Sequence, residues 1–125
     1  MSEILYNAWA EGALSWIADD STGLPWPLPT TWCLGEATED TRFLAIHLIR
    51  ATPDDLAPLS IGITAEGSIL IEWRKGSREL NIRVLPDVTL DISTWESAEL
   101  VEESSIERAA IWRLCRFFAW LRSTQ

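Results

Sequence analysis

The stretch "LSIGITAEGSILIEWRKGSRELNIRVLPDVTLDI", residues 59–92, decides the fold of this chain. Apolar and polar side chains alternate in four short runs, the pattern of β-strands that bury one face. The residues that share the apolar face are Leu59, Ile61, Ile63, Ile69, Ile71, Trp73, Leu80, Ile82, Val84, Val88, Leu90 and Ile92. The stretch therefore predicts four consecutive antiparallel strands over residues 59–92.

The turns between the runs predict the register, because a shift by one residue would turn an apolar face toward water. Gly76-Ser77 suits a two-residue turn, and residues 66–68 and 85–87 suit three-residue loops. The expected cross-strand pairs are Trp73 with Leu80, Arg74 with Glu79, Ile63 with Ile71, Ile61 with Trp73, and Val84 with Val88. All three loops keep the apolar residues on one face, which favours a simple meander.

Helices are predicted over residues 3–18, 39–51 and 105–122, where apolar residues recur at helical spacing. Thr38 is the expected N-cap of the second helix. The apolar face of the sheet needs a covering layer, and these helices are its candidates. Residues 1–125 are thus predicted to form a single α+β domain of order α-α-β-β-β-β-α, with the helices packed on one face of a four-stranded meander.

The composition narrows the classes of function. The chain has 125 residues, a net charge of −9 and eight tryptophans. The negative charge makes nucleic-acid binding unlikely and disfavours an anionic membrane surface, whereas it suits a basic protein partner. We expect no cofactor and no metal, because two cysteines and one histidine do not form a ligand set. With no signal peptide and no apolar run of spanning length, the expected location is the cytoplasm.

The segment "IERAAIWRLCRFFAWLR", residues 106–122, carries the candidate binding residues. Arg108, Trp112, Arg116 and Trp120 recur every four residues, so a continuous helix would place them on one stripe, with Arg113 beside it. The opposite arc is apolar and sufficient to cover the sheet. The two tryptophans are either covered by the N-terminal part of the chain or anchor a protein partner. Stacking on nucleic-acid bases is a further alternative that the net charge disfavours.

Two other segments leave alternatives open. Trp26 lies in the proline-rich "LPWPLP", residues 24–29, which is expected to be extended; it either docks on a partner or folds back on the core. Residues 87–107 contain seven carboxylates and no cation. Such a segment is either a solvated connector or a docking strip for a basic partner.

Residues 32–92 resemble a set of small, largely uncharacterised bacterial proteins. The resemblance rests on Pro58, Glu66-Gly67, Ile71-Glu72-Trp73 and the aliphatic alternation of residues 80–84, which match a pattern of strand, Asp-Gly and a strand ending in Leu-Glu-Trp. Upstream, Trp32 and Gly35 are similar to the Trp-Asp-Gly of that set, but the aspartate is absent here. The resemblance implies a fold and a bacterial or phage source, and it implies no activity.

These features predict a non-enzymatic domain that binds another protein or itself, as a small accessory subunit or an antitoxin-like or immunity-like neutraliser. One alternative is an acidic inhibitor that mimics nucleic acid. A less favoured alternative is an enzyme that uses carboxylates, with Glu72 near Glu79 and Asn81 on the outer face of the sheet. Such an enzyme would need a cleft, and a flat sheet face offers none.

Overall fold

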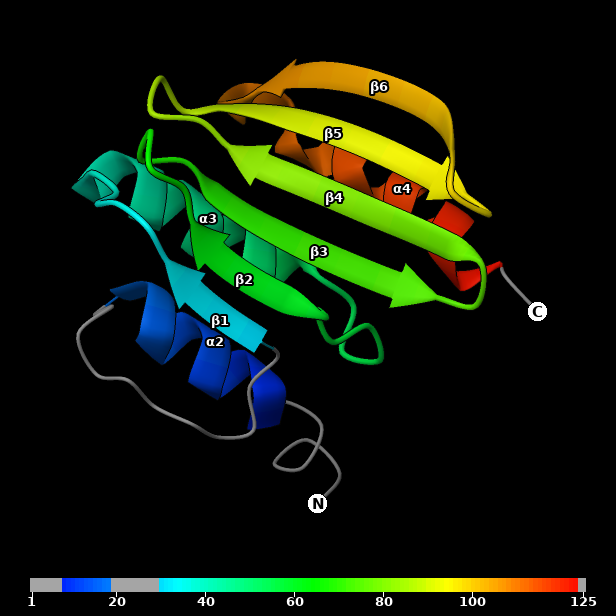
Figure 1. The fold of residues 1–125 in the computed structure, drawn as a ribbon, viewed down its shortest axis with the longest axis horizontal. Coiled ribbons are helices and arrows are strands. Elements are labelled where there is room, and N and C mark those ends of the chain that lie inside the picture. The colour runs from blue at the N-terminus through cyan, green and yellow to red at the C-terminus, as the bar shows by residue number, and fades with distance from the viewer. Residues whose placement is uncertain (1–7, 19–29, 124–125) are drawn as a thin grey trace.

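The computed structural model describes residues 8–18 and 30–123, which form a sheet with helices on one face (Figure 1). In chain order the elements are α2 (Ala8–Ala18), β1 (Thr30–Cys33), α3 (Glu39–Ala51), β2 (Ser60–Ile63), β3 (Ile69–Lys75), β4 (Arg78–Val84), β5 (Thr89–Glu96), β6 (Glu99–Glu107), the 3-10 helix η1 (Arg108–Arg113) and α4 (Leu114–Arg122). The predicted first turn of the helix over residues 3–18 lies outside the described residues, as does Trp26.

The α+β class is confirmed, whereas the sheet is larger than predicted. It has six strands in the order β1-β2-β3-β4-β5-β6. Strands β2 to β5 form the predicted antiparallel meander. Two further strands flank it: β1 pairs with β2 in parallel, and β6 pairs with β5 in antiparallel. The prediction of four strands and of a purely antiparallel sheet was therefore wrong.

The register of the central hairpin is the predicted one. Trp73 faces Leu80 and Arg74 faces Glu79 across β3 and β4. The other two predicted registers were wrong by two residues, because Ile61 faces Ile71, and Val84 faces Leu90. An even shift leaves the same side chains on the apolar face. Ten of the twelve residues predicted for that face are buried, whereas Leu59 is 50% exposed and Val88 is half-buried in a turn.

Both register errors have one cause, which is the position of the residue with a positive φ. In a three-residue hairpin loop this residue comes last. Gly67 holds that place after Ala65 and Glu66, with φ +90°. At the next hairpin Leu85 N–H donates to Thr89 O at 2.9 Å, so the loop is residues 86–88 and Val88 takes φ +60°. A β-branched residue in this region is strained, and the sequence pattern gives no sign of it.

Val88 provides a test of that strain. We expect Val88→Gly to be more stable than Val88→Ala by about 1 kcal/mol, because both variants lose the same side-chain packing but glycine removes the left-handed penalty. At an ordinary strand position the order is reversed. Urea unfolding of both variants measures the difference, and a more stable alanine variant would contradict the assignment of strain to this residue.

The helices cover one face of the sheet. Helices α3 and α4 both contact β3 and β4, and α2 packs against α3 (Figure 1). Thr38 is the predicted N-cap of α3, and its hydroxyl accepts from Thr41 N–H at 3.3 Å. Trp73 is 1% exposed at the centre of the core, where it makes an edge-to-face contact with Phe118 of α4 at 5.3 Å between ring centroids.

The last helix begins later than predicted and is divided. The expected helix over residues 105–122 would start inside β6, which runs to Glu107. Residues 108–113 form the 3-10 helix, with φ −103° and ψ 20° at Ala110, and α4 follows from Leu114. A 3-10 helix has three residues per turn, so residues four apart no longer lie on one stripe. Arg108 and Trp112 lie in the 3-10 helix, whereas Arg116 and Trp120 lie in α4, so the four residues do not form the predicted continuous stripe.

Candidate functional site

The predicted stripe is split into a buried part and an exposed part. Trp120 is half-buried and packs against the core. Its cationic neighbour is Arg78 of β4, whose guanidinium carbon lies 4.7 Å from the centroid of the indole ring. Arg116 instead lies over the ring of Phe117 at 4.2 Å. The cation that stacks on Trp120 therefore comes from the sheet, although Arg116 precedes Trp120 by four residues in α4.

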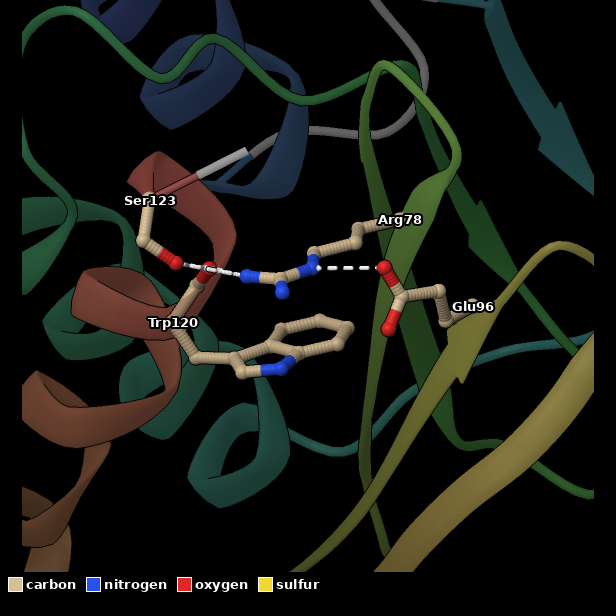
Figure 2. A network of polar contacts seen from close by, with 4 residues as sticks. All are labelled: Arg78, Glu96, Trp120 and Ser123. Atoms are coloured by element: carbon tan, nitrogen blue, oxygen red, sulfur yellow. Dashed lines mark hydrogen bonds and ion pairs between the residues drawn. The ribbon is translucent and has the colours of Figure 1, made fainter. Parts of the chain in front are cut away.

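Figure 2 shows how Arg78 holds the end of α4 against the sheet. Its Nη1 donates to the backbone oxygen of Trp120 at 2.6 Å and to Ser123 Oγ at 2.5 Å, and its Nε donates to Glu96 at 3.2 Å. The arginine side chain is 21% exposed. A planar guanidinium can satisfy these acceptors and the indole face together, which an ammonium cannot. Trp120 is thus part of the internal structure of the chain.

Trp112 has the opposite environment. It lies in η1 and is 71% exposed, which makes it a large apolar side chain in contact with water. Arg108 and Arg113 of the same 3-10 helix are also exposed, and they make no hydrogen bond or ion pair with any described residue. Of the predicted contact residues that the structure describes, Trp112, Arg108 and Arg113 are the ones available to a partner.

Arg116 lies in the first turn of α4, directly after η1, and connects that helix to β6. Its two terminal nitrogens donate to the carboxylate of Glu102, at 3.2 and 2.7 Å. Hydrogen bonds from Arg116 and then from Ser104 lower the pKa of Glu102, and the same carboxylate raises the pKa of Arg116. Trp112 precedes Arg116 by four residues, and Glu102 follows Val101 directly. The ion pair therefore ties α4, which follows η1 directly, to β6.

The acidic residues 87–107 form the last two strands of the sheet, β5 and β6, so the alternative of a solvated connector was wrong. Strand β6 has nine residues and pairs with β5 alone; none of the described residues pairs with its outer edge. Leu100 and Val101 are 45% and 53% exposed near its start. Glu99, Glu103 and Glu107 are exposed along it, and no described cation forms an ion pair with them. We call β6 together with Arg108, Trp112 and Arg113 the edge surface.

Sequence reasoning missed the strand character of β6 because its turn lacks the usual signal. Two-residue hairpin turns favour Asn-Gly or a similar pair, since both residues adopt positive φ. Here Ser97 and Ala98 hold φ values of 52° and 69°. A hydrogen bond of 2.8 Å from Ser97 N–H to Ser77 O ties this turn to the turn between β3 and β4. The one available signal was the apolar pair Leu100-Val101 inside the acidic segment.

Other kinds of site find little support in the described part of the chain. It holds no group of three or more histidine, cysteine or carboxylate side chains placed to bind a metal. None of its helices is long and apolar enough to span a bilayer. Glu72 accepts a hydrogen bond from Ser60 Oγ on the outer sheet face.

Comparison of the chain with known protein families, with curated proteins and with solved structures gives no match. The resemblance of residues 32–92 to small bacterial proteins therefore stays a prediction. The function has to be argued from the geometry of the chain itself.

Proposed function

We propose that this chain is a non-enzymatic protein-binding domain, a small accessory subunit or an antitoxin-like or immunity-like neutraliser. The observation that carries the proposal is Trp112, which is 71% exposed in the 3-10 helix that directly follows the open edge strand β6. Tryptophan and arginine are the residues most enriched in the energetic centres of protein interfaces. The edge surface supplies one tryptophan, two unpaired arginines and two exposed aliphatic residues.

Strand β6 supports strand addition as the mode of binding. An unpaired edge presents backbone N–H and C=O groups that an extended segment of a partner can pair with, which is a recurrent form of peptide recognition. The edge is long enough for such pairing, because β6 has nine residues whereas β1 at the other edge has four. Side chains of the partner strand would then contact Leu100 and Val101.

Charge argues for a basic partner strand over a second copy of this chain. If two copies of β6 paired antiparallel about Glu103, this residue would face its own counterpart, and Glu107 would approach Glu99 across the irregular stretch at residues 100–102. Like charges directly opposite one another destabilise strand pairing. A lysine-rich or arginine-rich strand would instead meet opposite charges along the whole edge. The proposed partner is therefore a protein with an extended basic segment.

A peptide of alternating lysine and valine tests the proposed mode. We expect it to bind the chain, and we expect Glu103→Lys with Glu107→Lys to weaken binding at least ~10-fold, because each reversal replaces an attraction by a repulsion. Glu36→Lys with Glu66→Lys is the matched control, since both residues are exposed but lie outside β6. Fluorescence anisotropy of the labelled peptide gives the affinities. Equal weakening by both double variants would show general charge attraction without use of the edge.

A separate experiment tests whether Trp112 contacts the partner. It compares Trp112→Ala with the parent chain in binding to the native partner, once that partner is isolated. We expect the variant to weaken that complex ~30-fold, the usual size of a tryptophan hot spot of about 2 kcal/mol. Leu34→Ala is the control, because Leu34 is similarly exposed, at 72%, but follows β1 at the other edge. If Trp112→Ala binds as tightly as the parent chain, the tryptophan is not the contact.

A second candidate is the acidic inhibitor that mimics nucleic acid, favoured by the unpaired carboxylates along β6. Exposed charge pairs weaken with ionic strength, whereas apolar anchoring does not. Loss of the native complex at ~0.5 M salt, together with an unchanged affinity of Trp112→Ala, would favour the mimic over the anchored domain.

A further inference from the structure

The face of the sheet that points away from the helices was expected to be flat, and this expectation was wrong: the face is hollowed over β4, β5 and β6. The hollow has a volume of about 560 Å³, and its lining includes Leu70, Asn81, Arg83, Asp91, Trp95 and Glu103. Small-molecule sites in proteins span about 300–1,000 Å³ and combine apolar walls with a few polar groups. The edge surface does not use these residues except for Glu103.

Two charged residues of the hollow face each other without bonding. Arg83 of β4 and Asp91 of β5 are cross-strand partners in the register. Opposite charges at such positions commonly pair, yet these two form no ion pair or hydrogen bond with each other or with any other described residue. The guanidinium of Arg83 and the carboxylate of Asp91 therefore both remain available to a ligand.

Asn81 contributes a polar atom that lacks a partner. Its Oδ1 is buried and accepts no hydrogen bond. An unsatisfied buried acceptor costs about 1–3 kcal/mol, so a ligand N–H that reached it would recover that free energy. Glu103 across the hollow adds a second carboxylate that forms no ion pair with a described cation. The lining thus holds two carboxylates and an unpaired amide oxygen together with the guanidinium of Arg83.

Apolar surface completes the lining. The indole Nε1 of Trp95 donates to Ser93 Oγ at 3.2 Å, and Ser93 is two residues earlier on the same face of β5. This hydrogen bond directs the ring along the strand, where it forms one wall of the hollow. Leu70 of β3 supplies apolar surface on the opposite side. An aromatic or aliphatic group can pack against both.

We propose that the hollow binds a zwitterionic α-amino acid with an apolar or aromatic side chain. The guanidinium of Arg83 matches the ligand carboxylate, since the two planar groups can form paired hydrogen bonds. Asp91 and the Asn81 acceptor match the ammonium group, and Glu103 adds negative charge on that side. Trp95 and Leu70 contact the side chain. This ligand site shares Glu103 with the edge surface, and it goes beyond the proposed protein-binding function.

L-Phenylalanine is the probe, with 2-phenylethylamine and 3-phenylpropionate as analogues that lack its carboxylate or its ammonium group. We expect saturable binding of phenylalanine in the millimolar range, seen as a shift of the Trp95 indole N–H in nitrogen-15 NMR spectra. Each analogue should bind at least ~10-fold more weakly, because it loses one charge-assisted contact.

Two variants assign the contacts. Arg83→Met should weaken phenylalanine ~10-fold and leave phenylethylamine unchanged, whereas Asp91→Asn should weaken both. Arg74→Met is the control on the same face, since Arg74 pairs with Glu79 outside the hollow and its loss should change neither affinity.

Three results would overturn the proposal. The first is no saturable shift at ~50 mM phenylalanine, a concentration well above a millimolar dissociation constant. The second is equal binding of phenylalanine and phenylethylamine, which would mean that Arg83 recognises no carboxylate. The third is an effect of Arg83→Met on the lysine-valine peptide but not on phenylalanine, which would make the hollow part of the protein-binding surface. Failure of the peptide experiment alone leaves this proposal intact.

Discussion

Replacing Trp73 by alanine is expected to lower the free energy of unfolding by about 4 kcal/mol, a large part of the stability of a domain of this size. Trp73 is 1% exposed, so its truncation leaves a large cavity inside the core. The variant also loses the hydrogen bond from Trp73 Nε1 to Leu56 O at 3.0 Å, which leaves a buried carbonyl without its donor. The edge-to-face contact with Phe118 is lost as well.

Trp112→Ala is the matched control for this experiment, because it deletes the same side chain at a site that is 71% exposed. We expect it to change stability by less than about 0.5 kcal/mol. Guanidinium unfolding followed by circular dichroism measures both variants. Similar losses for the two would show that Trp112 is covered within the chain, against the assignment of a partner anchor.

Replacing Arg78 by methionine is expected to lower stability by about 2–3 kcal/mol, because it removes the charge-assisted hydrogen bonds that join α4 to the sheet. Methionine keeps most of the apolar stem, so the loss isolates the guanidinium. The variant removes the hydrogen bonds to Trp120 O, Ser123 Oγ and Glu96, and the stacking on the Trp120 indole (Figure 2). The end of α4 should then open first on heating.

Two further variants sharpen the Arg78 result. Arg78→Lys keeps the positive charge but lacks the planar guanidinium, so it should recover less than half of the stability that Arg78→Met loses. Arg74→Met removes the exposed ion pair with Glu79 on the neighbouring turn, where the side chains are 56% and 34% exposed, and should cost at most about 1 kcal/mol. Full recovery by lysine would mean that charge alone, without the planar contacts, holds α4 in place.

The parts of the fold that could be predicted are those in which local chemistry and tertiary packing agree. Helix α3 has a capping threonine, acidic residues in its first turn and one apolar face, and its observed bounds are the predicted ones. The β3–β4 hairpin has a glycine-first turn and unbroken alternation on both strands. In each case the residues at the turn or cap favour the same structure as the spacing of the apolar residues and their burial in the core.

The parts that could not be predicted depend on tertiary contacts that local patterns do not show. Strand β1 is four residues long and is held by its parallel pairing with β2. Strand β6 exposes most of its side chains, so it has little apolar alternation to reveal it. The 3-10 helix begins where β6 ends, and a helical wheel cannot foresee that change of period. These errors affected the predicted contact residues. Trp112 is exposed as one alternative expected, whereas Trp120 packs against the core, and the edge strand β6 was not predicted.

The order of the strands also has a kinetic consequence. Each of β2 to β6 pairs with the strand that precedes or follows it in the chain, so these pairings close short loops. The parallel pairing of β1 with β2 instead joins two strands whose connection contains the whole of α3, so it closes a much longer loop. Short loops cost less entropy to close, and folds rich in local contacts fold faster. Folding would then begin in the meander, whose last hairpin carries the acidic edge, and the docking of β1 would come late.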